Sequence, residues 1–241
     1  MLILTDVSSI KNLNIFILLE QLKMSFFTSL SVTILSAFFI GLVFSLQIVK
    51  EFLYLSAVTL VGSVLSIAFL RELSPVLTSI ILVGKIGSLF TAELAAMAIT
   101  EQLDVLYILG INPIHYLILP RIIALLCVLP LLNFISFITS LVSSSFICFI
   151  LYNIEPRIFF ISVFSALSWL DFLKSFCKIF IFAFFISLIS CTLGFTANGG
   201  SKGVGIATTY SVVISLLSIF ILDFILSYLM FTNLDSSLKT L

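Results

Sequence analysis

The sequence predicts an all-α integral membrane protein, and three observations support that fold class. Only 9% of the 241 residues are charged and 61% are hydrophobic, whereas about 25% of residues are charged in ordinary soluble domains. The mean hydropathy is +1.35. Uncharged stretches also recur at the length of a membrane helix, which needs about 20 mostly apolar residues. A chain with so few charges cannot cover a surface that faces water, so lipid is its main solvent.

The uncharged stretches predict about five spans in one domain, residues 1–241. Before the first span, the polar residues Glu20, Gln21 and Lys23 lie among apolar residues, which is typical of a helix lying in the membrane interface. The alternative is that this segment is the frayed start of the first span. The expected elements are an N-terminal interfacial helix at about 13–24 and spans at about 25–49, 52–96, 117–152, 177–196 and 206–231.

The most polar internal stretch lies between the second and third spans and predicts a short amphipathic helix at about 100–110. Thr100 suits its N-cap, and Glu101 and Asp104 suit the positive end of the helix dipole. Gly110 suits its C-terminal end. A short acidic helix between two spans could dock a soluble partner, or it could be a loop helix resting on the membrane surface.

Charge and a helix breaker meet at "FLRELSPV", where Arg71 and Glu72 are followed by Pro75. Proline cannot donate a hydrogen bond to the carbonyl of residue 71, so a kink or break is expected at this turn. Charges within a membrane usually face a bundle interior or a cavity, because burying them in lipid costs about 2.5–3.5 kcal/mol or more. Two interpretations remain open: a polar cavity wall, or an ion pair where two helices meet at the membrane surface.

Small residues recur every four positions at Gly84, Ser88, Ala92 and Ala96. Such a stripe lets another helix approach closely, so helix–helix or dimer packing is expected. The charged residues Lys85 and Glu93 flank the stripe and are expected to be buried charges. Asp223, in the fifth span, is a further buried charge that either pairs with a neighbouring helix or serves function.

Several classes of function are excluded or disfavoured. The formal net charge of zero disfavours a nucleic-acid partner. His115 is the only histidine and the four cysteines are widely spaced, so no multi-histidine metal centre, cofactor site or catalytic set is expected. Lys85 lacks the glycine spacing and the following Ser or Thr of a phosphate-binding P-loop. We therefore expect no enzyme activity within the chain.

The central segment, residues 70–132, resembles the signature region of the MlaE-type permeases. The shared elements are R-E-x-x-P-V, G-[RK]-x-G-S, T-A-E, M-x-x-T-E-Q, an Asn-Pro turn, and P-R followed by L-P-L-L. The last span, with its L-D-F, is also similar, and the resemblance covers residues from about 15 to 232. Lys85 and Asn112 stand where the family commonly has Arg and Asp.

This resemblance implies a membrane subunit of a lipid-transporting ABC system, of the kind found in Gram-negative bacteria, cyanobacteria and plastids. It implies a homodimer, a separate ATPase subunit, and a substrate-binding MCE-domain protein on the opposite face. The short helix would be the coupling helix, with Thr100, Glu101, Gln102 and Asp104 meeting the ATPase. Arg71, Glu72 and Pro75 would line a phospholipid pocket, and the Arg71 guanidinium suits a phosphate because it can donate two parallel hydrogen bonds.

Two other functions remain as alternatives. A secondary transporter or channel without an ATPase would use the buried charges as an ion relay, although no inverted repeat is visible. An assembly factor would have no lipid cavity. The abundance of Phe and Ile fits an AT-rich genome and favours the plastid inner envelope, with the bacterial inner membrane as the alternative. The distribution of basic residues favours neither membrane orientation.

Overall fold

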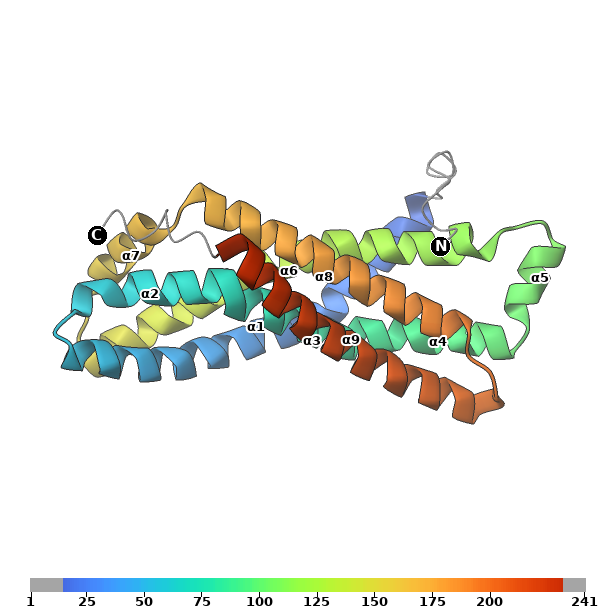
Figure 1. The fold of residues 1–241 in the computed structure, drawn as a ribbon, viewed down its shortest axis with the longest axis horizontal. Helices are drawn as coiled ribbons and strands as arrows, with labels where there is room; N and C mark the ends of the chain where they lie inside the picture. Colours follow the sequence, from blue (N-terminus) through green and yellow to red (C-terminus); the bar gives the residue numbers. More distant parts are fainter. Residues whose placement is uncertain (1–14, 232–241) are drawn as a thin grey trace. The chain divides into compact units, whose positions relative to one another are not determined.

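The computed structural model describes residues 15–231, and within that range the chain is helical with no strand. Figure 1 shows long helices joined by short connections and by two shorter helices, α5 and α7. The α-helices are α1 (Ile15–Tyr54), α2 (Val61–Ala68), α3 (Ser74–Leu82), α4 (Ser88–Ile99), α5 (Gln102–Ile108), α6 (Leu119–Tyr152), α7 (Pro156–Ala166), α8 (Trp169–Phe195) and α9 (Gly200–Phe231).

Five helical segments in the described range are long and apolar enough to cross a membrane, which confirms the predicted fold class. They are Phe16–Tyr54, Val58–Ile99, Ile114–Tyr152, Trp169–Phe195 and Gly200–Met230. The second combines α2, α3 and α4, and the third combines α6 with the helical turn before it. The chain is therefore a multi-pass membrane protein.

The first span has no separate helix in front of it. Residues 15–24, predicted as part of an interfacial helix, form the first turns of α1, which continues without a break to Tyr54. Any interfacial portion therefore belongs to the same helix as the first span. Residues 13 and 14 lie outside the described range.

The second span corrects the expected break at Pro75. The chain stays helical there, and a π-helical turn, η4 (Phe69–Leu73), leads directly into α3. Proline leaves the carbonyl of Arg71 without its usual α-helical donor, and the Nζ atom of Lys178 on α8 donates to that oxygen at 3.0 Å. A widened turn and a donor from another helix thus replace the break. Similar π turns precede α4, η5 (Val83–Gly87), and α6, η6 (Ile114–Ile118).

Contacts divide the chain into two compact units, so each is described by itself. Among the described residues, the first takes in 15–29, Ile80–Leu129 and Phe180–Ile219, and the second takes in Leu30–Ser79, Pro130–Ile179 and 220–231. The prediction of one domain over residues 1–241 stays a prediction.

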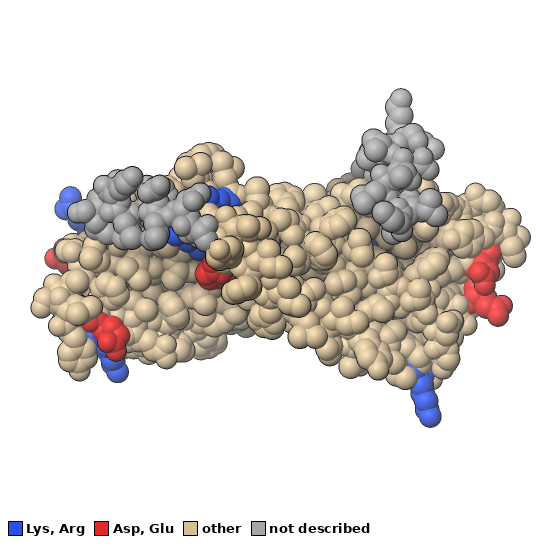
Figure 2. All heavy atoms as spheres, in the orientation of Figure 1, with Lys and Arg blue, Asp and Glu red and all other residues tan. Residues whose placement is uncertain are grey.

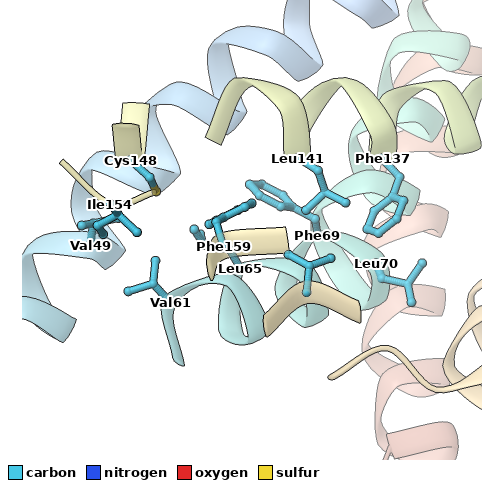
Figure 3. Packing of buried hydrophobic residues seen from close by; sticks show 11 residues of the cluster. Val49, Val61, Leu65, Phe69, Leu70, Phe137, Leu141, Cys148, Ile154 and Phe159 are labelled. Carbon is cyan, nitrogen blue, oxygen red and sulfur yellow. The ribbon is translucent and has the colours of Figure 1, made fainter. Parts of the chain in front are cut away.

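The core of the second unit lies where α2 packs against α7. In Figure 3 the side chains of Leu65, Phe69 and Phe159 point toward one another, and all three are buried. Gly62 permits this close approach, because a Cβ atom there would lie 2.5 Å from the carbonyl oxygen of Phe159. The packing fixes the start of the second span against the connection between α6 and α8.

The core of the first unit combines apolar and hydroxyl contacts. Leu94 and Ile122 are buried in one cluster that joins α4 to α6. The hydroxyl of Thr91 lies 3.0 Å from the carbonyl oxygen of Ser190 on α8 and 2.8 Å from the hydroxyl of Ser211 on α9. Hydroxyl bonds of this kind are typical of helix contacts in lipid, where small residues allow close packing.

Candidate functional site

A buried lysine is the centre of the charged cluster in the second unit. The Lys178 side chain is 0% exposed. Its Nζ atom lies 2.8 Å from Oε2 of Glu72 and 2.6 Å from Oδ1 of Asp223, and it donates to the hydroxyl of Ser227 at 2.9 Å. Glu72 comes from η4, Lys178 from α8, and Asp223 and Ser227 from α9. One ammonium group therefore joins three helices.

A second ion pair lies on the same two elements, η4 and α8. The Nη2 atom of Arg71 donates to Oδ1 of Asp171 at 2.8 Å. Asp171 is only 2% exposed, and its other oxygen accepts a hydrogen bond from Ser168 at 2.7 Å. The Arg71 guanidinium, which the sequence analysis assigned to a lipid phosphate, is thus bound to a carboxylate of its own chain.

The charges of the five ionisable groups in this cluster do not sum to zero. Three carboxylates, on Glu72, Asp171 and Asp223, face the two cations Arg71 and Lys178, so the cluster holds one excess negative charge when all are ionised. Glu72 is the most open of them, with 43% of its side chain exposed. The cluster is therefore a buried, cross-linked polar site with one accessible carboxylate.

Sequence reasoning found part of this cluster. It singled out Arg71, Glu72 and Asp223, and the structure brings Glu72 and Asp223 to one ammonium group. It did not single out Asp171 or Lys178 as members of a buried site. Their spacing of seven residues is two helical turns, which puts both on one face of a helix, and that pattern could have revealed them. Pro75 acts through the backbone, by leaving the Arg71 carbonyl to Lys178.

The short helix α5 lies at the turn between α4 and α6 (Figure 1). Its observed range is Gln102–Ile108, and Thr100 is not its N-cap, because Thr100 ends α4 and its hydroxyl donates to the carbonyl of Ala96 at 2.9 Å. Glu101 holds the N-cap position with a left-handed φ of 59°. The change of direction between α4 and α5 therefore occurs at Glu101, after the carboxyl end of α4.

The surface of α5 is acidic and apolar together. Glu101, Gln102 and Asp104 are exposed, and Figure 2 shows acidic side chains gathered over this end of the chain on a face that is otherwise largely uncharged. Ile108 is 84% exposed and Leu109 is 66% exposed. Sequence reasoning named the polar residues of this surface and missed the apolar ones.

The predicted small-residue stripe lies on the free side of its helix in the described chain. Gly84 and Ala96 are exposed, Ser88 and Ala92 are half-buried, and a Cβ atom at Gly84 would meet nothing within 4 Å. The side of the helix that packs within the chain is the neighbouring row, whose members Gly87, Thr91 and Ala95 are buried. The prediction that Lys85 is a buried charge is wrong, because its side chain is exposed beside the stripe.

Glu93, the second charge beside the stripe, pairs with a residue that sequence reasoning did not single out. The Nη2 atom of Arg121 on α6 donates to Oε2 of Glu93 on α4 at 2.7 Å. Both residues belong to motifs shared with the permease family, T-A-E and P-R.

Comparisons with known proteins agree with the architecture of a multi-pass membrane protein. The family model described as "Permease MlaE" matches residues 18–229. A probable ABC transporter permease protein, ycf63, of Pyropia yezoensis is 51% identical over 92% of this chain and 84% of its own length. A probable ABC transporter permease protein, slr1045, of Synechocystis is 44% identical over 88% of this chain and 81% of its own length.

A plant relative extends the comparison. The chloroplastic protein TRIGALACTOSYLDIACYLGLYCEROL 1 of Arabidopsis thaliana is 44% identical over 92% of this chain and 63% of its own length. The family match covers nearly all of the described helices, and the relatives match over most of the chain. The chain therefore belongs to the MlaE family of ABC transporter permeases.

Proposed function

We propose that this permease moves phospholipid-type lipids between membranes, powered by ATP hydrolysis on a separate ATPase subunit. The observation that supports it most directly is the charged cluster around Lys178, which places polar groups inside spans that are otherwise apolar. Ionisable groups within membrane-spanning segments usually mark a functional site such as a substrate pathway. The plant relative is named after a glycerolipid, and the other relatives are named as ABC permeases.

Arg71, Glu72 and Pro75 form the polar part of the proposed lipid pocket. The Arg71 guanidinium is oriented by Asp171, so it would meet a lipid phosphate while still paired with that carboxylate. Glu72 is the more exposed neighbour and would contact the same headgroup. The apolar residues of the surrounding spans would accept the acyl chains.

The helix α5 is the proposed coupling helix. Thr100, Glu101, Gln102 and Asp104 would meet the ATPase through polar contacts, and the exposed Ile108 would pack against an apolar part of the ATPase surface. A surface with both acidic and apolar residues, such as that of α5, suits a protein partner, because protein interfaces combine an apolar centre with a polar rim.

Two further partners complete the proposed assembly. A second copy of the chain would pack on the stripe of Gly84, Ser88, Ala92 and Ala96, which has room for a close helix contact. An MCE-domain protein would deliver or receive the lipid on the face opposite the ATPase. The plastid inner envelope is the proposed location, since the relatives are named for a chloroplast or come from algae and cyanobacteria.

A reconstitution experiment tests this function. The chain is purified with its candidate ATPase, bound lipid is extracted, and transfer of fluorescent phospholipid from proteoliposomes is measured with and without ATP. We expect co-purified phospholipid and transfer that requires ATP. Ion flux without ATP, and no bound lipid, would instead support the secondary transporter or channel.

A further inference from the structure

Arg121 and Glu93 connect the two helices on either side of α5. Glu93 lies on α4, about two turns before that helix ends, and Arg121 lies in the first turn of α6. Their 2.7 Å hydrogen bond is charge-assisted and therefore stronger than a neutral one. The Arg121–Glu93 pair closes the base of the helical hairpin that presents α5.

The pair is buried unevenly. The side chain of Arg121 is 4% exposed, while that of Glu93 is 31% exposed. The guanidinium carbon lies 5.4 Å from the centre of the Phe90 ring, a distance at which a cation–π contact forms. The Nη1 atom of Arg121 is buried and has no hydrogen-bond partner among the described residues.

Stability alone gives little reason for this arrangement. Replacing a buried ion pair by apolar residues of similar volume is often neutral or stabilising, and the neighbourhood of Arg121 is already apolar, with Leu94 and Ile122 in one cluster. Apolar packing is non-directional, so it permits one helix to slide on another. A hydrogen-bonded ion pair fixes the register between α4 and α6.

The helix α5 depends on its two neighbours for its position. Of its residues only Leu103 is buried, and a seven-residue helix is not stable on its own. The turns at its two ends contain residues in the left-handed region, Glu101 with a φ of 59° and Gly110 with a φ of 75°. A force applied to α5 therefore reaches the spans through the ends of α4 and α6.

We propose that Arg121 and Glu93 are positioning residues that make α5 and the spans move together. With the pair formed, the ends of α4 and α6 keep their register, so a displacement of α5 moves both helices. Without the Arg121–Glu93 pair, α5 tilts about the turns at its two ends, and a smaller part of its displacement is transmitted to α4 and α6. This inference rests on the proposed function, in which α5 receives the ATPase.

The test measures lipid transferred per ATP hydrolysed in the reconstituted complex. The double variant Glu93→Gln with Arg121→Met removes both charges together, so neither remains buried without its partner. We expect this variant to retain ATPase association and ATP hydrolysis, while the transfer ratio falls about tenfold, within the usual range of coupling between sites. A purely structural role would lower association and hydrolysis along with transfer.

Two variants serve as controls. Arg121→Lys keeps a cation opposite Glu93 and should retain a ratio near that of the wild type. Arg157→Met removes an exposed arginine from α7 and should leave the ratio unchanged.

A wild-type transfer ratio in the neutral double variant would overturn the proposed positioning role. If that variant does not fold, Glu93→Ala replaces it, since it removes the acceptor of the pair at the more exposed of the two residues. An unchanged ratio in Glu93→Ala also overturns the role. Failure of the wild-type chain to bind an ATPase or transfer lipid would contradict the proposed function itself, which distinguishes the two failures.

Discussion

An ammonium group inside a bilayer is stable only when its protons are bound and its charge is balanced. Lys178 meets both conditions, because its Nζ atom contacts two carboxylates, a hydroxyl and a backbone carbonyl at 2.6–3.0 Å. The backbone carbonyl is the one that Pro75 deprives of its helical donor. The Lys178 side chain therefore neutralises carboxylate charge and also donates a hydrogen bond to the Arg71 carbonyl, which belongs to a different helical segment.

Replacing Lys178 by methionine should strongly destabilise the protein. The change leaves Glu72 and Asp223 facing each other without a cation, and breaking a buried pair in this way costs about 3–5 kcal/mol. Thermal unfolding in detergent should show a clear fall in Tm.

Neutralising both acids as well should recover much of that loss. The triple variant Lys178→Met, Glu72→Gln and Asp223→Asn leaves no unpaired charge in this part of the cluster. Lys202→Met, at an exposed lysine, is the matched control and should keep the wild-type Tm. A Lys178→Met protein as stable as the wild type would contradict the assigned role of the ammonium group.

The sequence indicates some members of this cluster and conceals others for a physical reason. Arg71 and Glu72 stand out because charge is rare in the segment around them. Lys178 and Asp171 lie near the start of a span, where charged residues usually reach the membrane surface. Their burial depends on partners from other helices, and a single sequence does not show those distances.

Among the elements, α5 shows how a short helix can be both predicted and misread at its boundary. Its position between two spans and its acidic start were predicted correctly. The boundary residue was wrong, because Thr100 bonds back into α4 and Glu101 takes the left-handed turn. A Thr hydroxyl can also donate to the carbonyl four residues earlier, as Thr100 does to Ala96, instead of capping the next helix.

The substitution Glu101→Lys should weaken binding of the ATPase subunit without unfolding the chain. It reverses the charge of an exposed residue at the proposed contact, and charge reversal at an interface mainly lowers the association rate and the affinity. Pull-down of the ATPase at low salt should fall about tenfold.

Glu155→Lys provides the comparison for that experiment. Glu155 is also exposed, and it lies at the start of α7, away from α5 in the sequence. Its reversal should leave the pull-down unchanged. Equal retention of the ATPase by the Glu101 and Glu155 variants would contradict the coupling role of α5.

Across the whole molecule, the five spans were predictable because each has the length and apolarity that a bilayer requires. The π turns were not predictable: Pro75 follows η4 and Pro113 precedes η6, but η5 has no proline beside it, so no single residue type signals a π turn. The small-residue stripe is a mixed case. Its spacing was evident, but the adjacent row of Gly87 and Thr91 makes the contacts within the chain, leaving Gly84 on an open surface.

Enlarging Gly84 should therefore affect assembly and leave the folded monomer intact. Gly84→Leu adds a side chain where nothing lies within 4 Å, but it would block close approach of a second copy. Cross-linking in detergent or light scattering should show fewer dimers, while the Tm stays near the wild-type value.

Gly62→Leu is the contrasting variant for that measurement. A side chain there would overlap the backbone of Phe159, so Tm should fall, since overpacking costs about 1–3 kcal/mol. A Gly84→Leu protein that dimerises like the wild type would show that the stripe is not the contact between copies.

The cluster around Lys178 also has a consequence for biogenesis. Its charges come from η4, α8 and α9, which leave the ribosome in that order, so Glu72 enters the membrane long before Asp223 has been synthesised. Until α9 arrives, Lys178 has a single carboxylate partner from the second span, and charges held in lipid without their full set of partners are unstable. Synthesis of the last span therefore completes the set of partners around Lys178, because Asp223 and Ser227 both lie on α9.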